Sequence, residues 1–273
     1  MEVKELTDKL NFEAFGVKIS VASNDLRILR KIRNILPQVI PENLHFKKSI
    51  QTEHLFEIEK DFHSDRMRVL KDGSELFKFT NVDRLLEYVS SQLRITVAEF
   101  AQSRVFIHAG AVGWKDSAII IPGKSFSGKT TLVSELISLG AEYYSDEYAV
   151  LDQYGFLHPY PKTLSMRGII NDFDQVETPP DVFGAKIGKK NLPVKLVLLS
   201  EFDKERIWEP QILKPGEGML DLLKHTIPIR FKPEFVLKVL REVSGRAVFA
   251  KCRRGDIKIS APLIIEFFET HCM

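Results

Sequence analysis

Apolar and polar positions in the N-terminal third follow patterns that are typical of a small α/β unit. Residues 17 to 21 alternate between apolar and polar side chains, which predicts a half-buried strand. The apolar positions that follow recur every three or four residues, which predicts a helix. Ser23 or Asn24 is expected to cap this helix, and Pro37 is expected to end it, because the residue before a proline is pushed out of the helical conformation.

Alternating segments follow this helix, and Asp72-Gly73 between the last two of them predicts a β-hairpin. From Asn81 a long run with helical spacing extends to Phe100 and predicts a second helix. No pattern in this region points to chemistry. We therefore expect residues 1 to 102 to form a small N-terminal α/β domain.

In the rest of the chain, strand-like segments are interleaved with helical ones. Residues 117 to 121 form a short apolar run, which predicts a buried strand. Residues 172 to 193 are rich in Pro, Gly and Lys and are expected to form a loop. Near the C-terminus we expect a short strand over residues 257 to 259 and a helix after Ser260. This alternation favours a second α/β domain over residues 103 to 273.

Composition and charge narrow the function classes. The chain has 273 residues, of which 44% are apolar and 28% are charged, as expected for a globular protein with a sizeable core. Its 39 basic and 37 acidic residues leave a net charge of +2, which disfavours nucleic acid or an acidic membrane surface as partner. Its two cysteines have no metal-ligand spacing, and no apolar run approaches the length needed to span a membrane. We expect a cytoplasmic protein.

One glycine-rich octapeptide, residues 123 to 130, carries the strongest chemical signal. It fits the phosphate-binding (Walker A) pattern G-x-x-x-x-G-K-[S/T], in which glycines let backbone amides face phosphate oxygens and the lysine adds positive charge. An apolar strand precedes it and a helix that stops at Gly140 follows it, which is the context the motif requires. The alternative is a glycine-rich turn with an unrelated lysine. The octapeptide and the next threonine predict these ATP-binding residues: Gly123, Lys124, Ser125, Phe126, Ser127, Gly128, Lys129, Thr130 and Thr131.

Two carboxylates, Asp146 and Glu147, follow the strand that comes after this helix. A carboxylate there is expected at the carboxyl end of its strand, on the same edge of the sheet as the phosphates. Phosphoryl transfer needs magnesium ligands and a group that orients or deprotonates the attacking hydroxyl, and this pair suits both needs. The alternative is a solvated acidic turn. Residues 195 to 201 lack the apolar run ending in Asp that motor and switch ATPases carry, and the GTPase N-K-x-D motif and an ABC-type signature are absent.

Four motifs in fixed order resemble the catalytic domain of HPr kinase/phosphorylase. They are His108-Ala109-Gly110, the octapeptide, Ser145-Asp146-Glu147 and residues 166 to 170. The family has a His-Gly strand, a phosphate loop, an Ala-Asp-Asp element and an E-I-R-G-x-G signature in this order, and the likeness covers residues 103 to 270. The resemblance implies an α/β fold with a P-loop kinase core of the HPr-kinase/PEP-carboxykinase type, preceded by a small α/β domain. It also implies ATP and Mg²⁺.

The resemblance assigns roles to single residues. Asp146 matches the catalytic aspartate that takes the proton from a serine hydroxyl, and His108 matches the active-site histidine that assists it. Thr130 stands where the family has the serine whose hydroxyl binds magnesium. Arg167 matches the signature arginine, which would steady phosphate charge during transfer. Without the resemblance, His108 would be interpreted as a packed strand residue and Arg167 as part of a surface ion pair.

The chain also departs from the family. Ser165 stands where the signature has a glutamate, so a magnesium ligand or its support is missing or is supplied by Glu147. Lys124 stands where the bifunctional enzymes have an aspartate, and the second glycine of the signature is absent. These differences weigh against the HPr protein as substrate, and more strongly against phosphorylase activity.

The motifs together predict an ATP-dependent kinase that transfers the γ-phosphoryl group to a serine-type hydroxyl on a protein or peptide. One alternative is a nucleotide-binding regulator whose kinase activity has decayed. Ser165, in place of the signature glutamate, favours this alternative. A carboxykinase acting on a C3 or C4 acid is disfavoured, because the chain lacks a cluster of arginines and metal-binding histidines. The expected partner is a protein or peptide that carries the serine, and neither nucleic acid nor membrane. Family members often form hexamers, so a homo-oligomer stays open.

Overall fold

The computed structural model describes residues 8 to 124, 127 to 167 and 175 to 273. The chain divides into two compact units, and the division lies between Ser103 and Arg104. Both units combine helices with β-sheet, which confirms the expected α/β class. Within the described residues, no helix has the length and apolar character that crossing a membrane requires.

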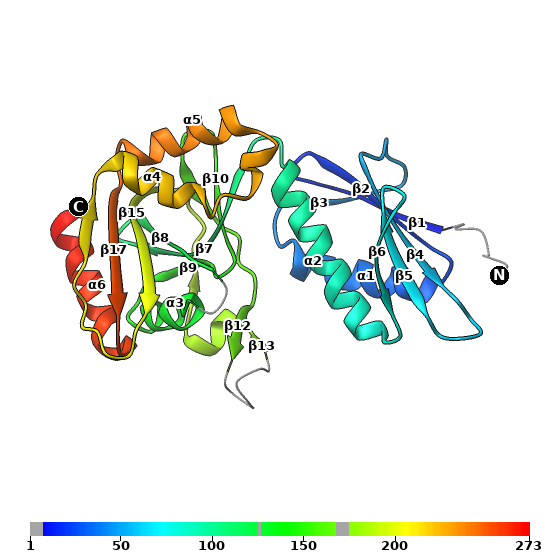
Figure 1. Cartoon of the computed structure of the whole chain (residues 1–273), viewed down its shortest axis with the longest axis horizontal. Helices are drawn as coiled ribbons and strands as arrows, with labels where there is room; N and C mark the ends of the chain where they lie inside the picture. The colour runs from blue at the N-terminus through cyan, green and yellow to red at the C-terminus, as the bar shows by residue number, and fades with distance from the viewer. Residues whose placement is uncertain (1–7, 125–126, 168–174) are drawn as a thin grey trace. The chain divides into compact units, whose positions relative to one another are not determined.

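The first unit is a six-stranded sheet with two helices (Figure 1). Its strands are β1 (Asp8–Ala14), β2 (Val17–Ser23), β3 (Leu44–Lys47), β4 (His54–Lys60), β5 (Met67–Lys71) and β6 (Ser74–Phe79), and its helices are α1 (Leu26–Val39) and α2 (Val82–Phe100). The strand order is β3–β1–β2–β4–β5–β6, and neighbours are antiparallel except β2 and β4. Alternate side chains of these strands, among them Phe12, Ile19 and Phe56, are fully buried, as the apolar alternation predicts.

Helix α1 begins and ends differently from the prediction. Its cap is Asp25, whose carboxylate accepts a hydrogen bond from the Arg27 amide, whereas the Ser23 hydroxyl donates to the carbonyl of Ile58 on β4. Pro37 lies inside the last turn and does not end the helix. The turn persists because Ile40 is fully buried and its amide donates to the Leu36 carbonyl, so the packing outweighs the one hydrogen bond that a proline removes.

The second unit is built on a nine-stranded sheet. Its strands are β7 (Val105–Trp114), β8 (Ser117–Pro122), β9 (Glu142–Ser145), β10 (Tyr148–Leu151), β11 (Phe156–His158), β14 (Lys186–Ile187), β15 (Leu192–Phe202), β16 (Gln211–Leu213) and β17 (Val248–Arg254). A separate two-stranded ribbon is formed by β12 (Leu164–Arg167) and β13 (Gln175–Thr178). The pairings β7–β8, β8–β15, β15–β11, β11–β10 and β10–β7 close a ring of strands.

Strand direction brings several carboxyl ends to one edge of this sheet. Strands β8, β15 and β17 are parallel neighbours. Strand β9 runs in the same direction as β8, because each of them is antiparallel to β7. The segments that leave these strands therefore meet at one edge, where open α/β sheets usually bind ligands.

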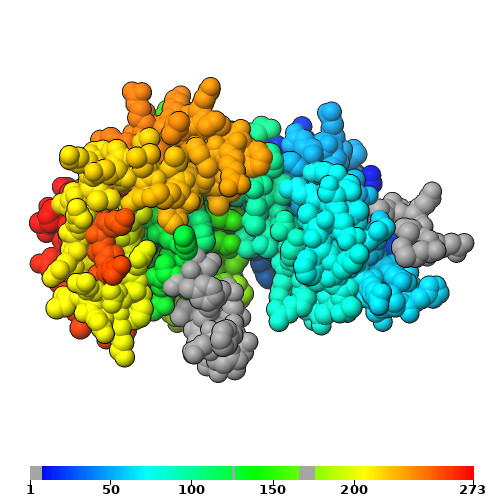
Figure 2. All heavy atoms as spheres, in the orientation of Figure 1, coloured from blue at the N-terminus to red at the C-terminus, as the bar shows by residue number. Residues whose placement is uncertain are grey.

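Helices cover both faces of the sheet. On one face, α3 (Lys129–Ser138) and α6 (Ile257–His271) enclose a core that includes Val112, Leu136 and Phe268. On the other face, α4 (Pro215–Leu223) and α5 (Pro233–Ser244) enclose a core that includes Ile107 and Phe249. The yellow-to-orange atoms of α4 and α5 form an outer layer of this unit in Figure 2. Two short 3₁₀ helices, η1 (Pro180–Phe183) and η2 (Ile227–Arg230), lie in the connections.

Two sequence expectations for this unit are wrong. Residues 257 to 259 are the first turn of α6 rather than a strand, because Asp256 caps the helix and the buried positions continue with helical spacing into the core. The expected loop over residues 172 to 193 contains β13, η1 and β14 among its described residues. Backbone pairing of β13 with β12, and of β14 with β9, gives this stretch regular structure despite its prolines and glycines.

Two glycines of α4 offer a matched test of this packing. A Cβ on Gly218 would come within 2.2 Å of the ring of Phe249, which is 1% exposed, whereas nothing lies within 4 Å of a Cβ on Gly216. We expect Gly218→Ala to lower the free energy of unfolding by about 1–3 kcal/mol through overpacking. Gly216→Ala is expected to leave it unchanged or to raise it by no more than about 1 kcal/mol. Denaturant unfolding of both variants checks this, and equal effects would contradict the close approach of α4 to β17.

Candidate active site

The glycine-rich octapeptide joins the carboxyl end of β8 to the first turn of α3. Gly128 is the N-cap of α3 and has a φ of 79°, a left-handed conformation that a side chain would strain. Gly123 is buried, and a Cβ there would lie 2.6 Å from the Ser127 hydroxyl. Ser125 and Phe126 lie outside the described residues. The local sequence thus forms the strand before the octapeptide and the helix after it, as its pattern predicts.

The side chain of Lys129 lies inside this turn. It is 8% exposed, and its Nζ donates to the carbonyls of Gly123 and Lys124, at 2.8 Å each. Burial lowers the pKa of Lys129, while the negative charges of Asp146 and Glu147 act in the opposite direction. A cation held at the N-terminus of a helix, where free amides point outward, favours an anion at this place.

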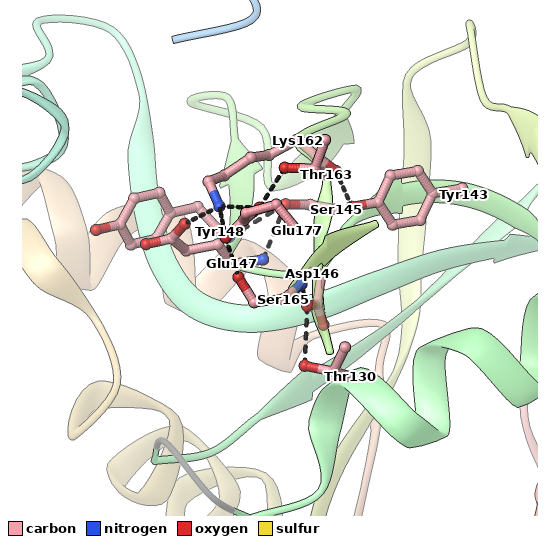
Figure 3. A network of polar contacts seen from close by, with 10 residues as sticks. All are labelled: Thr130, Tyr143, Ser145, Asp146, Glu147, Tyr148, Lys162, Thr163, Ser165 and Glu177. Atoms are coloured by element: carbon pink, nitrogen blue, oxygen red, sulfur yellow. Dashed lines mark hydrogen bonds and ion pairs between the residues drawn. The ribbon is translucent and has the colours of Figure 1, made fainter. Parts of the chain in front are cut away.

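The hydroxyl of Thr130 joins the loop to the carboxylate that follows β9. Thr130 Oγ1 donates to Asp146 Oδ2 at 2.9 Å, and the Ser165 amide donates to the same oxygen at 3.4 Å (Figure 3). Asp146 Oδ1 is also buried but has no hydrogen-bond partner among the described residues. Burial raises the pKa of Asp146 to about 7, although the bonds from Thr130 and Ser165 and the charges of Lys129 and Lys162 oppose it. The unpartnered Oδ1 of this carboxylate can therefore accept a proton or bind a cation.

A second polar cluster lies beside Asp146, around the buried amine of Lys162. Its Nζ is 3.4 Å from Glu147 Oε2 and 3.2 Å from Glu177 Oε2. Glu177 also accepts hydrogen bonds from the hydroxyls of Ser165, at 2.5 Å, and Thr163. Burial opposes the charge of Glu177, but Lys162 and these hydroxyls outweigh it and hold the pKa of Glu177 below its usual range. Figure 3 shows Lys162 reaching both carboxylates.

Glu177 is a residue that sequence reasoning missed. It lies on β13 directly opposite Ser165 of β12, so the strand pairing brings its carboxylate to the Ser165 hydroxyl. The alternation of Gln175-Val176-Glu177-Thr178 is a weak strand signal that lies within the stretch expected to be a loop. The position of Glu177 beside Ser165 becomes visible only from the pairing of β13 with β12.

His108 lies on β7, half-buried, with its ring edge-on to Tyr148 at a centroid distance of 6.4 Å. Its carbonyl accepts a hydrogen bond from the Gly123 amide at 3.4 Å, and its own amide donates to the carbonyl of His225 at 2.8 Å. The main chain of His108 thus contacts the start of the glycine-rich loop. His225 is a second residue that the sequence did not reveal. Burial and the nearby charge of Lys129 lower its pKa.

The remaining predicted residues are placed as follows. Arg167 is the last residue of β12, and its side chain lies outside what the structure describes. Lys124 and Thr131 are exposed, and the Ser127 hydroxyl is buried with no hydrogen-bond partner among the described residues. The carboxylate of Glu147 faces Lys162 at 3.4 Å.

The donor atoms present fit a magnesium ion held chiefly by a nucleotide. The described residues contain no group of three or more His, Cys, Asp or Glu side chains arranged to hold a metal. They do contain the Thr130 hydroxyl and, next to its hydrogen-bond partner Asp146, the carboxylate of Glu147. Magnesium takes oxygen ligands and is commonly bound by one or two carboxylates together with substrate phosphates. Thr130 and Glu147 suit that arrangement, which leaves the unpartnered Oδ1 of Asp146 for a proton.

This chain has a distant structural match among solved proteins. The structure of the HPr(Ser) kinase/phosphatase from Coxiella burnetii is similar to this chain at 12% sequence identity and a TM-score of 0.30, over 60% of this chain and 94% of that chain. No protein-family model matches the chain, and no curated protein sequence does so either. A match this distant carries no functional argument, so the function is argued from the residues of the site.

Proposed function

We propose that this chain is an ATP-dependent kinase that transfers the γ-phosphoryl group to a serine-type hydroxyl on a protein or peptide. The observation that carries the proposal is the 2.9 Å hydrogen bond between Thr130 Oγ1 and Asp146 Oδ2. It joins the last residue of the phosphate-binding pattern to a buried carboxylate whose second oxygen has no partner among the described residues. A nucleotide cradle and a proton acceptor lie side by side, as phosphoryl transfer requires.

Residues 123 to 131 would hold the triphosphate of ATP. The amides at the start of α3 and the ammonium of Lys129 would bind phosphate oxygens, and Lys129 would exchange its two carbonyl partners for them. Thr130 and Glu147 would hold Mg²⁺, which neutralises charge on the phosphates. We place this P-loop core, of the HPr-kinase type, over residues 103 to 273.

Asp146 would act as the general base. Its Oδ1 takes the proton as the hydroxyl oxygen of the acceptor forms a bond to the γ-phosphorus, while the bond to the β-γ bridging oxygen breaks and ADP leaves. A base works best when its pKa lies near the working pH, and burial raises the pKa of Asp146 to about 7. His108 would assist Asp146, and Arg167 would steady charge on the transferred group. The partner would be a protein or peptide that carries the serine, met in the cytoplasm.

Glu177 would position β12 beside Asp146, because its carboxylate binds the Ser165 hydroxyl while the Ser165 amide binds Asp146. We expect Glu177→Gln to lower the turnover number for transfer about 10-fold. Nucleotide affinity is expected to stay within about twofold, since Glu177 contacts none of the described loop residues. Steady-state kinetics of the variant measure both quantities. Glu142→Gln is the matched control, because Glu142 is exposed at the start of β9; equal effects of the two changes would contradict the positioning role.

The alternative function is a nucleotide-binding regulator without kinase activity, which Ser165 in place of the signature glutamate favours. Incubation with ATP, Mg²⁺ and serine acceptors (the HPr protein, serine-containing peptides and free serine) separates the two functions. The kinase is supported by ADP release that depends on the acceptor, together with phosphoserine detected by mass spectrometry. Tight ATP binding without transfer to any acceptor would support the regulator instead.

A further inference from the structure

Arg254 is a buried arginine at the edge of the sheet where the glycine-rich loop lies. It is the last residue of β17, which runs parallel to β15 and in the same direction as β8. The residue is 2% exposed, and its Nη2 donates to the carbonyl of Gly128 at 2.7 Å. A residue 126 positions after Gly128 thus contacts the N-cap of α3.

The close contact depends on the absence of a side chain at Gly128. A Cβ at this position would lie 2.7 Å from Arg254 Nη2. Gly128 therefore has two reasons to be a glycine, its left-handed φ and the room that it leaves for the guanidinium. The guanidinium of Arg254 thus places a positive charge directly beside the N-cap of α3.

The guanidinium is not fully satisfied in this place. Its Nε is buried and lacks a hydrogen-bond partner among the described residues, and Asp203 pairs with the neighbouring Arg253. Burial lowers the pKa of Arg254, with Cys252 acting in the opposite direction. An arginine stays charged in proteins, and a buried charge is costly unless an anion and hydrogen-bond acceptors compensate for it.

We propose that Arg254 is a phosphate-binding residue of this site, whose guanidinium pairs with the triphosphate of the bound nucleotide. The inference rests on the proposed function only in that a nucleotide is held by the octapeptide. Planar guanidinium groups bind phosphate oxygens with paired hydrogen bonds, and the free Nε together with a terminal nitrogen forms one side of that fork. Arg254 stands on a strand rather than on a loop, so its position is set before the nucleotide arrives.

The neighbouring Arg253 provides a matched control. Its side chain points to the other face of the strand, is 62% exposed and lies 3.5 Å from Asp203 Oδ2. The same substitution at either residue removes one positive charge, but only Arg254 contacts the loop. Any loss that depends on the general charge of the unit would therefore appear in both variants.

The test measures the binding of MgATP, MgADP and AMP by calorimetric titration for the native chain and for Arg254→Met, Arg254→Lys and Arg253→Met. We expect Arg254→Met to weaken MgATP at least about 10-fold, MgADP less, and AMP least, because the loss follows the phosphate charge. Arg254→Lys is expected to recover part of the MgATP affinity, and Arg253→Met to match the native chain. Thermal unfolding without nucleotide shows whether each variant is folded. If Arg254→Met does not fold, the comparison of Arg254→Lys with the native chain tests the proposal.

An arginine that only clamps the Gly128 carbonyl would give another pattern. Arg254→Met would then unfold at a lower temperature and weaken all three nucleotides by one common factor, which would overturn the inference. Unchanged MgATP binding in Arg254→Met would overturn it as well, without touching the proposed transfer reaction. Conversely, if the graded loss is found but the native chain phosphorylates no acceptor, the kinase proposal fails and the role of Arg254 stands.

Discussion

Phosphoryl transfer is expected to fall about 10²–10⁴-fold when Asp146 is replaced by asparagine, while MgATP still binds. The asparagine keeps an oxygen that can accept the Thr130 hydrogen bond, but it cannot take the proton from the attacking hydroxyl. The measurement is acceptor-dependent ADP release, with calorimetry for the nucleotide. Asp152→Asn is the control, since Asp152 belongs to the same unit and pairs with His158 at 2.9 Å, and we expect native transfer rates from it. A native rate from Asp146→Asn would rule out Asp146 as the base.

The same substitution is expected to stabilise the chain in the absence of nucleotide. Burial raises the pKa of Asp146 from 3.8 to about 7, so the stability that this group contributes is complete below pH 3.8 and is lost as the pH rises through about 7. Asparagine carries no charge at any pH, so the variant does not lose this contribution to the free energy of unfolding as the pH rises. We expect Asp146→Asn to exceed the native free energy of unfolding by about 1–3 kcal/mol at about pH 8, and by much less at about pH 5. Calorimetric unfolding at both pH values checks the difference; a less stable variant at the higher pH would contradict the burial of an ionised carboxylate.

A second large effect is expected at Lys129, where substitution by methionine should weaken MgATP at least about 100-fold. The buried ammonium is held between two loop carbonyls beside the first turn of α3. Methionine keeps the unbranched chain of lysine up to its ε position and removes the charge, so the loss of affinity reports the interaction with phosphate. Titration calorimetry gives the affinity, and the rise in unfolding temperature with MgATP gives an independent value.

Lys258→Met is the matched control for Lys129→Met. Lys258 lies on α6, is exposed and pairs with Glu135 of α3 at 2.7 Å, so it touches the same helix without entering the loop. Its replacement is expected to leave MgATP affinity within about twofold of the native value. Unchanged MgATP binding in Lys129→Met would remove the reason for treating residues 123 to 130 as a phosphate cradle.

Local patterns in the sequence predicted the parts of the site that neighbouring residues build. The strand before residues 123 to 130 and the helix after them depend on apolar spacing within one stretch, and the structure has both. The expected position of Asp146 at the same sheet edge as the loop follows from strand direction, and the bond from Thr130 agrees with it. What these residues bind stays a prediction until the experiments above are done.

Contacts between distant stretches were beyond local reasoning. Glu177 reaches Ser165 only because β13 pairs with β12. The few residues of β13 are mostly polar, so their pattern gives little indication of a strand. Arg254 reaches Gly128 only because β17 joins β15. The predicted end of α1 at Pro37 is wrong for a similar reason, because the burial of Ile40 within the first unit decides how far α1 extends.

The place of β17 in the sheet has a consequence for how the second unit folds. Every other strand of this unit precedes it in the chain, yet it pairs with β15 on one side and β16 on the other. During synthesis the earlier strands can form first. The edge of β15 that pairs with β17 stays without a partner strand until β17 has left the ribosome. A nascent chain would therefore gain Arg254 beside its glycine-rich loop only as the last of these strands is added.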